Sequence, residues 1–527
     1  MQEKVAHHPV REVWRSAARG PRLPSAPPVL DLITPHLEHA GPGTAVTDPD
    51  GGLSYAELRR LALDVAASLR ALGVRPGEPV VVRTRLSRWA VPAMLGVLYT
   101  GAHYVPVDTA FPPGRQAAVI RASGARFAVT EPEDTNGPLD WSAGNPPTVI
   151  EVGARHGPAI GVCPASPRSE TPAYCLYTSG SSGPPKGVLV SHAALGYSTA
   201  ARIAHYGEAP RVYLLCSSIS FDSSVAGIYW TLATGGHLVI PSADPLDTEA
   251  VAAAAHAHRA SHLLTLPSLY DALLDSADAG ALDSLRTVIV AGETCPPYLV
   301  RRHFAGLPDA ALFNEYGPTE CTVWALVHRC APADGQRDSV PIGRPVPGTE
   351  IGLVPGGPGG EGTGELWVRS PGVALGYAGA LGTGTPFIND GTRRTYRTGD
   401  LVRFDEQGDA HFAGRADSQL KLAGMRIELS EIEYLVREHT GAAAAALGVA
   451  RGAAGPPRLM AFLVRPAAGF RPAELHTALR RHLPRAAVPR SVHTLERLPT
   501  LPNGKLDRAA LDRMAAERLS PAGRSVR

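Results

Sequence analysis

The chain has 527 residues, of which 44% are hydrophobic and 19% are charged, as in an ordinary folded protein. This length is too great for one compact core, so several structural units are expected. A formal net charge of +2 gives no basic excess for binding nucleic acid or an anionic membrane. The six cysteines form no CxxC pair, which favours reduced thiols in a cytoplasmic protein over zinc sites or disulfides.

Helix and strand patterns alternate in the first third of the chain. Ser54 and Glu57 have the spacing of a capping box, and apolar residues then recur at intervals of three and four as far as Leu72. The apolar stretch 89–107 predicts a buried helix over 90–99 and a strand over 104–108, and its Pro92 and His103 argue against a membrane span. This alternation predicts α/β layers with largely parallel sheets.

A loop rich in glycine and hydroxyl side chains, Tyr177 to Gly187 (YTSGSSGPPKG), lies between two β-prone runs, 173–176 and 188–190. Glycine allows the backbone to approach a ligand, hydroxyls donate hydrogen bonds, and Lys186 adds a positive charge. The loop therefore indicates an anion site, with phosphate as the natural ligand. Its spacing is not that of a P-loop, because GxxxxGK[ST] does not occur.

Polar or glycine residues follow several strand patterns in the middle of the chain. FDSS (221–224) follows the run 212–217, Gly292 follows 287–291, and NEYGPTE (314–320) begins where the run 311–313 ends. Ligands of α/β sheets bind outside the carboxyl ends of strands, so Phe221, Gly292 and Asn314 are predicted to line one crevice.

The last part of the chain changes in pattern. Short strands with many glycines over 341–412 predict a barrel-like or distorted sheet, which contains YRTGDL (396–401). Beyond it, about 110 residues of alternating strands and helices predict a small separate domain, with its boundary at Asp417. Near its end, LPNGKLDR (501–508) contains the tight-turn pair Asn-Gly.

These stretches, together with LSYAEL (53–58) and LYTGAHYVPVD (98–108), match signatures of one known family in the family's order. The chain resembles the adenylate-forming enzymes, and FDSS, NEYGPTE and LPNGKLDR are most similar to the amino-acid adenylation domains of nonribosomal peptide synthetases. The resemblance implies an α/β fold with two domains. Residues 1–416 would form an adenylation core of layered sheets plus a barrel-like β unit, and 417–527 a small mobile α+β domain.

The implied reaction is ATP-dependent activation of an amino acid as aminoacyl-AMP, with release of pyrophosphate and with Mg²⁺ as the metal. The aminoacyl group would then pass to the 4′-phosphopantetheine thiol of a carrier protein in trans, since no carrier motif follows LPNGKLDR. The alternative is an acyl- or aryl-CoA ligase, which shares the first step. A small MbtH-like accessory protein is a further candidate partner, whereas nucleic acid and membrane are not expected.

The resemblance also assigns roles to individual residues. Lys505 would bridge the substrate carboxylate and the α-phosphate, Thr319 would bind the α-phosphate, and Glu320 would hold Mg²⁺. Asp417 matches the hinge of the mobile domain. Nucleotide binding is assigned to Thr178, Ser179, Gly180, Ser181, Ser182, Gly183, Lys186, Gly292, Asn314, Tyr316, Gly317, Asp400 and Arg415.

The amino-acid pocket is assigned to Asp222, Ser223, Ala226, Thr265, Ile289, Ala291, Glu315, Val323 and Trp324. Asp222 matches the family's partner for the substrate ammonium, and the remaining set predicts an aromatic or partly polar side chain. Glu315 is discordant, because a buried carboxylate needs a hydrogen-bond donor or a cation. It predicts a phenol, an indole or a basic side chain in the substrate, and the sequence leaves these open.

Overall fold

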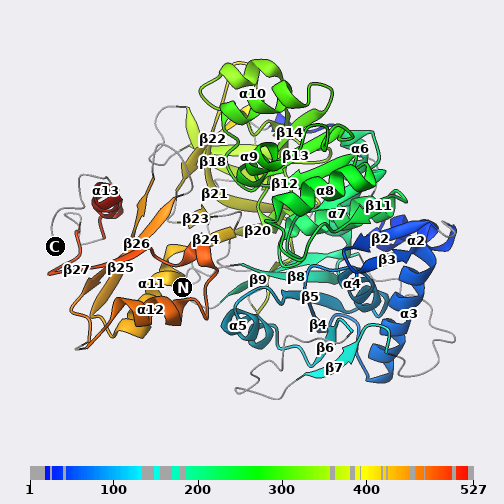
Figure 1. Cartoon of the computed structure of the whole chain (residues 1–527), viewed down its shortest axis with the longest axis horizontal. Helices are drawn as coiled ribbons and strands as arrows, with labels where there is room; N and C mark the ends of the chain where they lie inside the picture. Colours follow the sequence, from blue (N-terminus) through cyan, green and yellow to red (C-terminus); the bar gives the residue numbers. More distant parts are fainter. Residues whose placement is uncertain are drawn as a thin grey trace.

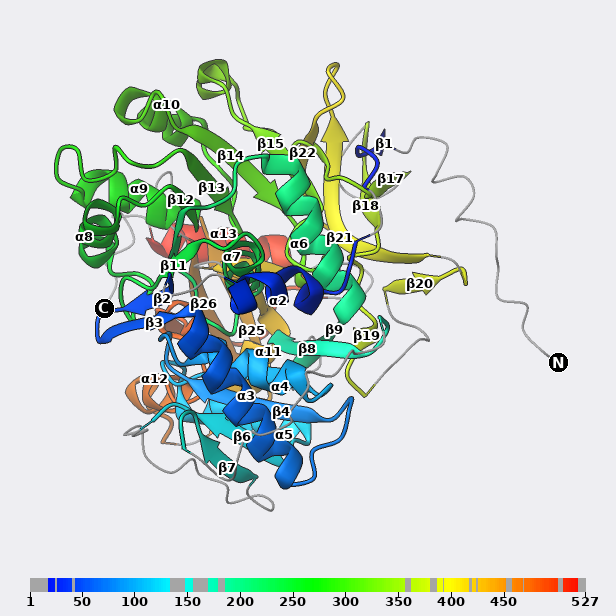
Figure 2. The same ribbon diagram turned by 90° about the vertical axis from the view of Figure 1, so that its right-hand side faces the viewer.

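The computed structural model describes residues 18–23, 26–39, 43–132, 147–154, 169–178, 185–355, 362–379, 386–391, 393–416, 419–422, 425–451, 457–467, 469–500 and 506–519. These residues form layers of sheets and helices, as the sequence predicts (Figures 1 and 2). No helix in these ranges has the length and apolar character needed to cross a membrane.

The first large sheet has nine strands in the order β16-β15-β14-β13-β12-β10-β11-β2-β3. Its central strands from β14 to β2 are parallel, while β3, β15 and β16 join antiparallel at the edges. The strands are β2 (Thr44–Asp48), β3 (Gly51–Ser54), β10 (Val212–Leu215), β11 (His237–Val239), β12 (His262–Thr265), β13 (Thr287–Ala291), β14 (Ala311–Tyr316), β15 (Leu326–Arg329) and β16 (Arg344–Pro345).

The second large sheet has seven strands in the order β19-β9-β8-β5-β4-β6-β7. Parallel pairing runs from β7 to β8, and β9 and β19 pair antiparallel. The strands are β4 (Pro79–Thr84), β5 (His103–Asp108), β6 (Phe127–Thr130), β7 (Thr148–Glu151), β8 (Pro172–Thr178), β9 (Lys186–Ser191) and β19 (Gly376–Tyr377).

Helices fill the space between these two sheets and cover their outer faces. Between the sheets lie α2 (Val29–His39), α3 (Tyr55–Ala71), α4 (Ala90–Tyr99), α6 (His192–Tyr206) and α7 (Asp222–Ala233) (Figure 2). The outer faces carry α5 (Pro113–Ser123) on one sheet, and α8 (Thr248–His258), α9 (Pro267–Ser276) and α10 (Pro297–Gly306) on the other.

Two of the inner helices, α3 and α4, form as their local sequence patterns predict. The predicted capping box is present at the start of α3, where Ser54 and Glu57 satisfy each other's backbone N–H groups. All ten residues of α4 are buried, so the apolar stretch is a core helix, as predicted.

The glycine-rich stretch forms a six-stranded antiparallel sheet whose register shifts twice, at Glu365/Trp367 and Leu401/Val402. Its strands are β1 (Ala18–Arg19), β17 (Glu350–Pro355), β18 (Thr363–Arg369), β20 (Phe387–Asn389), β21 (Arg394–Phe404) and β22 (Ala410–Arg415). The 3₁₀ turns η2 (Thr319–Cys321) and η3 (Pro332–Gln336) lie between β14 and β16.

Residues 419–519 build two further sheets. The hairpin β23 (Gln419–Leu422) and β24 (Met425–Glu428) precedes a sheet of β25 (Ala444–Ala450), β26 (Arg458–Val464) and β27 (Ser491–Leu495). One face of that sheet packs on α11 (Leu429–Thr440) and α12 (Pro472–Leu479), and the other on α13 (Arg508–Leu519). The turn η4 (Arg485–Ala487) follows α12.

The end of strand β14 was predicted wrongly. The strand β14 does not end at Phe313 but continues through Asn314 and Glu315 to Tyr316. The reason is tertiary: β13 pairs with Glu315 on one side, and β15 pairs with both Glu315 and Tyr316 on the other. The polar side chains of NEY therefore lie within a paired strand and not in a loop.

Candidate active site

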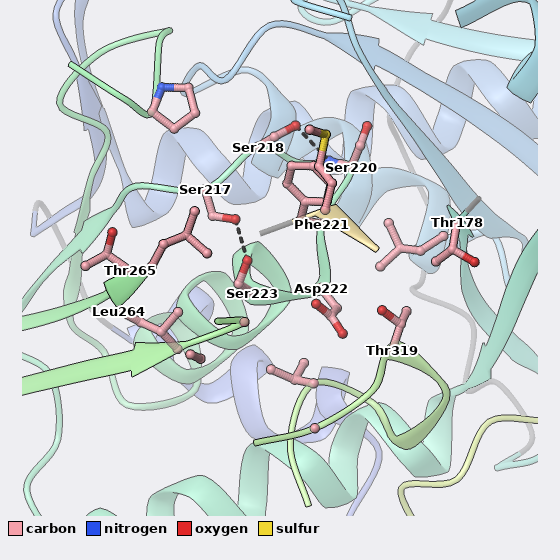
Figure 3. Close-up of a pocket in the computed structure, with 18 of the residues that line it drawn as sticks. Thr178, Ser217, Ser218, Ser220, Phe221, Asp222, Ser223, Leu264, Thr265 and Thr319 are labelled. Atoms are coloured by element: carbon pink, nitrogen blue, oxygen red, sulfur yellow. Dashed lines mark hydrogen bonds between the residues drawn. The ribbon is translucent and has the colours of Figure 1, made fainter. Parts of the chain in front are cut away.

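A cavity of about 160 Å³ lies where all three large sheets and the β23–β24 hairpin meet. Thr178 enters it from β8, Thr265 from β12, Asp400 from β21 and Met425 from β24. Figure 3 shows Thr178, Asp222 and Thr319 around this one space. The parallel strands β12 and β13 deliver their carboxyl ends to it, which is where ligands of α/β sheets bind.

Asp400 forms a buried ion pair in the cavity wall. Its carboxylate accepts hydrogen bonds from Arg415 Nη1 and from the hydroxyl of Tyr316. Asp400 and Arg415 stand opposite each other in the β21–β22 ladder, so strand register fixes the pair. Burial, and next the Asp400 carboxylate, raise the pKa of Tyr316 far above its usual value, so the phenol stays a hydrogen-bond donor.

The predicted anion loop has strands at both of its ends. Thr178 closes β8, Lys186 opens β9, and these two residues pair antiparallel. The Lys186 ammonium lies 5.8 Å from the centre of the Tyr377 ring. The loop residues assigned to phosphate binding, Ser179, Gly180, Ser181, Ser182 and Gly183, lie outside the described residues, as do Asp417 and Lys505.

The turn after β14 is tightly built beside the cavity. A side chain at Gly317 would meet backbone atoms of Trp324 at 2.4 Å, so only glycine fits there. Thr322 and Val323 have φ values of 55° and 82°, an unusual conformation for β-branched residues. Thr322 is held in place because its hydroxyl donates to Gly372 O at 2.6 Å, and Val323 is thereby presented to the cavity wall.

Glu320 is suited to a hard cation such as Mg²⁺. Its side chain is buried in η2 next to Thr319, and Oε1 accepts a hydrogen bond from the Tyr377 hydroxyl at 2.8 Å. Magnesium is commonly bound by one or two carboxylates, with phosphate and water oxygens completing its shell. A single oriented carboxylate beside a predicted phosphate site fits that pattern.

The cavity is also lined by small and hydroxyl side chains. Asp222 projects into it from the start of α7, and the hydroxyls of Ser217 and Ser223 hydrogen-bond each other (Figure 3). Thr265 Oγ1 is buried and, among the described residues, has no hydrogen-bond partner. A buried hydroxyl without a partner is unfavourable, and a polar group brought within its reach would remove that cost.

The structure places the sequence-predicted residues unevenly around this cavity. Those in its wall are Thr178, Asp222, Ser223, Thr265, Ala291, Gly292, Glu315, Gly317, Thr319, Val323, Asp400 and Arg415. Those that do not line it are Lys186, Ala226, Ile289, Asn314, Tyr316, Glu320 and Trp324. Of the predicted strand-end crevice, Phe221 and Gly292 line the cavity, whereas the Asn314 amide donates to Pro341 O at 2.8 Å.

Glu315 differs most from the sequence expectation of a carboxylate that awaits a substrate. Arg202 of α6 makes a bidentate ion pair with it, at 2.6 and 2.9 Å, and the Tyr206 hydroxyl donates to it as well. The expected need for a donor or cation is therefore met inside the protein. Arg202 sits in an ordinary helical stretch, and no local sequence signal marks it as the partner of residue 315.

Arg115 and Met425 are two further wall residues that sequence reasoning missed. Arg115 is buried on α5 and lies 3.8 Å from Glu431 of α11, so it joins the cavity wall to the C-terminal segment. Burial lowers the pKa of Arg115, and Glu431 opposes that effect. Neither residue belongs to a motif, because their roles arise from contacts between distant segments.

The comparisons with known proteins agree with this geometry. The family of AMP-binding enzymes matches residues 37–378, well over half of the chain. The chain belongs to the AMP-binding enzymes. It is an adenylate-forming ligase of the kind found as adenylation domains in nonribosomal peptide synthetases, which confirms the resemblance seen in the sequence.

Individual relatives give the extent of the similarity. Phosphinothricin tripeptide synthetase PhsC of Streptomyces viridochromogenes is 37% identical over 522 residues, covering 94% of this chain and 45% of the relative. Holo-PA1221, an NRPS protein with adenylation and PCP domains, superposes with a TM-score of 0.76 at 28% identity, covering 93% of this chain and 84% of that one. The amide bond synthetase McbA of Marinactinospora thermotolerans gives a TM-score of 0.78 at 26% identity, over 92% and 99% of the two chains. This AMP-binding enzyme thus spans less than half the length of phosphinothricin tripeptide synthetase PhsC.

The Asp400 pair leads to a first prediction for this AMP-binding enzyme. Asp400→Asn keeps the shape of the side chain but removes the charge that orients Arg415 and would accept the ribose hydroxyls. Hydrogen bonds to a charged group contribute about 1.5–3 kcal/mol, so kcat/KM for ATP should fall by about 10- to 100-fold. The measurement is the ATP dependence of pyrophosphate exchange.

Asp409→Asn is the matched control, because Asp409 pairs at 2.8 Å with the solvent-facing Arg344 and does not line the cavity. It should leave kcat/KM for ATP within about twofold of the original, since exposed ion pairs contribute little. An unchanged kcat/KM for ATP in Asp400→Asn would exclude Asp400 from the nucleotide site.

Proposed function

We propose that this AMP-binding enzyme activates an α-amino acid as aminoacyl-AMP and then transfers it to the 4′-phosphopantetheine thiol of a carrier protein. In the first step a substrate carboxylate oxygen bonds to the α-phosphorus of ATP, and the bond to pyrophosphate breaks. In the second step the thiol sulfur bonds to the acyl carbon and AMP leaves. The observation that supports this most strongly is one cavity lined by both Asp222 and the Asp400–Arg415 pair.

Different wall residues would bind different parts of the two substrates in this scheme. Asp400 and Arg415 would hold the ribose, with Gly317 toward the adenine, while Thr319 would donate to the α-phosphate. Tyr316 would act only through its hydrogen bond to Asp400. Asp222 would bind the substrate ammonium. Two anions must be brought together without a protein nucleophile, so the protein contributes positioning and charge compensation. Mg²⁺ held by Glu320 would neutralise phosphate charge.

The substrate side chain would face Ser217, Ser223 and Thr265, so it is proposed to be partly polar or aromatic. Exchange of labelled pyrophosphate into ATP across a panel of amino acids tests the activation step. Exchange with at least one α-amino acid is expected. Exchange only with carboxylic acids that lack an amine would overturn the proposed substrate class.

The thiol acceptor is proposed from the likeness to PA1221, which itself contains adenylation and PCP domains. The alternative, a CoA ligase, shares the activation step and differs only in the acceptor. Incubating enzyme, ATP and the best amino acid with either holo-carrier protein or CoA separates them. Thioester on the carrier and none on CoA is the expected result. The MbtH-like partner stays a prediction, tested by soluble yield with and without its co-expression.

The C-terminal segment 417–527 is proposed to be a mobile domain that swings between the two steps. In this structure it contacts the core through the Arg115–Glu431 pair and through Gly114 N–H, which donates to Arg481 O at 3.0 Å. Met425 of this segment reaches the cavity. Because segment 417–527 places Met425 in the cavity wall, the segment must move if another of its residues is to occupy the position of Met425.

Asp417→Pro tests the hinge. Proline fixes φ and hinders rotation about this residue, so thioester formation should fall by roughly tenfold or more while pyrophosphate exchange is retained. Asp417→Ala is the matched control, because it removes the same carboxylate without fixing the backbone. Equal losses in both steps for the proline variant would count against Asp417 as the hinge.

A further inference from the structure

Glu315 lines the cavity, but its carboxylate already has hydrogen-bond partners within the protein. Arg202 Nη1 and Nη2 donate to its two oxygens at 2.6 and 2.9 Å, and the Tyr206 hydroxyl donates to Oε1. The side chains of Arg202 and Glu315 are only 1% and 2% exposed. A bidentate guanidinium–carboxylate pair in this setting carries no net charge and leaves few lone pairs for a ligand.

Aromatic rings enclose the cation and hold it in place. The Arg202 guanidinium lies 4.4 Å from the Trp324 ring centre, and the rings of Tyr206 and Trp230 lie at 5.7 and 5.6 Å. Burial opposes the charged form of Arg202, but Glu315 outweighs it and raises the pKa of the guanidinium. Arg202 cannot easily leave this enclosure to free Glu315 for a substrate cation.

Among the described acidic side chains of the cavity wall, Glu315 and Asp400 each have an arginine partner, which leaves Asp222 for the substrate ammonium. Ser217, Ser223 and Thr265 offer hydroxyls, and Ala291 and Val323 offer small apolar surfaces. A lysine or ornithine side chain would bring a second ammonium into a cavity in which Asp222 is taken by the first and the carboxylates of Glu315 and Asp400 are each paired with an arginine. An unpaired buried cation is strongly unfavourable.

We propose that Arg202 is a positioning residue that neutralises Glu315, so that the pocket selects an α-amino acid with an uncharged side chain and excludes lysine and ornithine. The proposal rests on the proposed amino-acid activation. In this proposal Glu315 does not bind a basic substrate side chain but forms a neutral pair with Arg202 in the pocket wall. The hydroxyl of Thr265 then contacts a polar group of the substrate.

The first test uses the unmodified enzyme in the pyrophosphate-exchange assay. Uncharged amino acids (serine, threonine, asparagine, glutamine, phenylalanine, tyrosine, tryptophan, valine) are compared with lysine, ornithine and arginine. The best uncharged substrate should exceed every basic one by more than roughly 100-fold in kcat/KM. A basic amino acid within about tenfold of the best uncharged one overturns the proposal. Exchange with no amino acid at all contradicts the proposed function instead, so the two failures are distinct.

The second test changes the net charge of the Arg202–Glu315 pair. Arg202→Met leaves Glu315 without its cation, so the ratio of kcat/KM for ornithine to that for the best uncharged substrate should rise by roughly tenfold or more. The matched double variant Arg202→Met/Glu315→Gln keeps these two positions neutral. It should therefore retain the ratio of kcat/KM values seen with the unmodified enzyme. A merely structural role would lower both rates together and leave this ratio unchanged.

Thermal melting identifies folded variants before the ratios are compared. A folded Arg202→Met variant with the original ratio overturns the proposal. If that variant does not fold, the double variant decides, because both members of the buried pair are removed together. A folded double variant that gains activity toward ornithine shows that charge at residue 315 does not set the substrate class, and it too overturns the proposal.

Discussion

Lys505→Ala is expected to reduce pyrophosphate exchange by about 10²- to 10³-fold, because one charged donor aimed at the transition state contributes roughly 3–4 kcal/mol. In the proposed reaction this ammonium lies between the carboxylate and the α-phosphate, whose negative charges repel each other as the new bond forms. The position comes from the motif LPNGKLDR, and Lys505 lies outside the described residues. The fold should be kept, since the sequence predicts an Asn-Gly turn next to Lys505 and not a core position.

The two half-reactions provide the control. Thioester formation from a supplied aminoacyl-AMP does not need the carboxylate–phosphate bridge, so Lys505→Ala should perform it at close to the original rate. Lys505→Arg keeps the charge and should lose less exchange activity than alanine does. Retention of more than about a tenth of the exchange rate by Lys505→Ala would exclude this lysine from the transition state.

Asp222→Asn is expected to lower kcat/KM for the amino acid by about 10²- to 10³-fold, since removing one partner of a buried charge pair costs roughly 3–5 kcal/mol. The side chain projects into the cavity from the first turn of α7, where it would meet the substrate ammonium (Figure 3). The loss should be confined to substrates that carry an amine. The corresponding acid without the amine should react as well as, or better than, with the original enzyme.

Asp283→Asn is the matched control for Asp222→Asn, because Asp283 is exposed and does not line the cavity. It should leave kcat/KM and the melting temperature unchanged, as isolated surface substitutions usually do. If Asp222→Asn lowered activity equally with the amine-bearing and the amine-free substrate, ammonium recognition would have to be assigned elsewhere.

Several elements of the fold follow from the sequence alone. The helix 90–99 and the strand 287–291 have the bounds that their patterns predict, and Ser54 caps α3 as its spacing to Glu57 indicates. These features depend on interactions within a few residues along the chain: apolar periodicity, caps and β-prone runs. Motif order over most of the chain likewise sufficed to identify the adenylate-forming family.

The tertiary structure alone decided the state of the substrate pocket. Glu315 has the same sequence context whether it is free or paired, and its partner Arg202 lies 113 residues away on a helix packed beneath β14. Met425 enters the cavity only because the β23–β24 hairpin is docked against the core. Charge compensation between distant segments has no local signature. The sequence therefore determined the family of this protein, and packing determined that Glu315 is already paired.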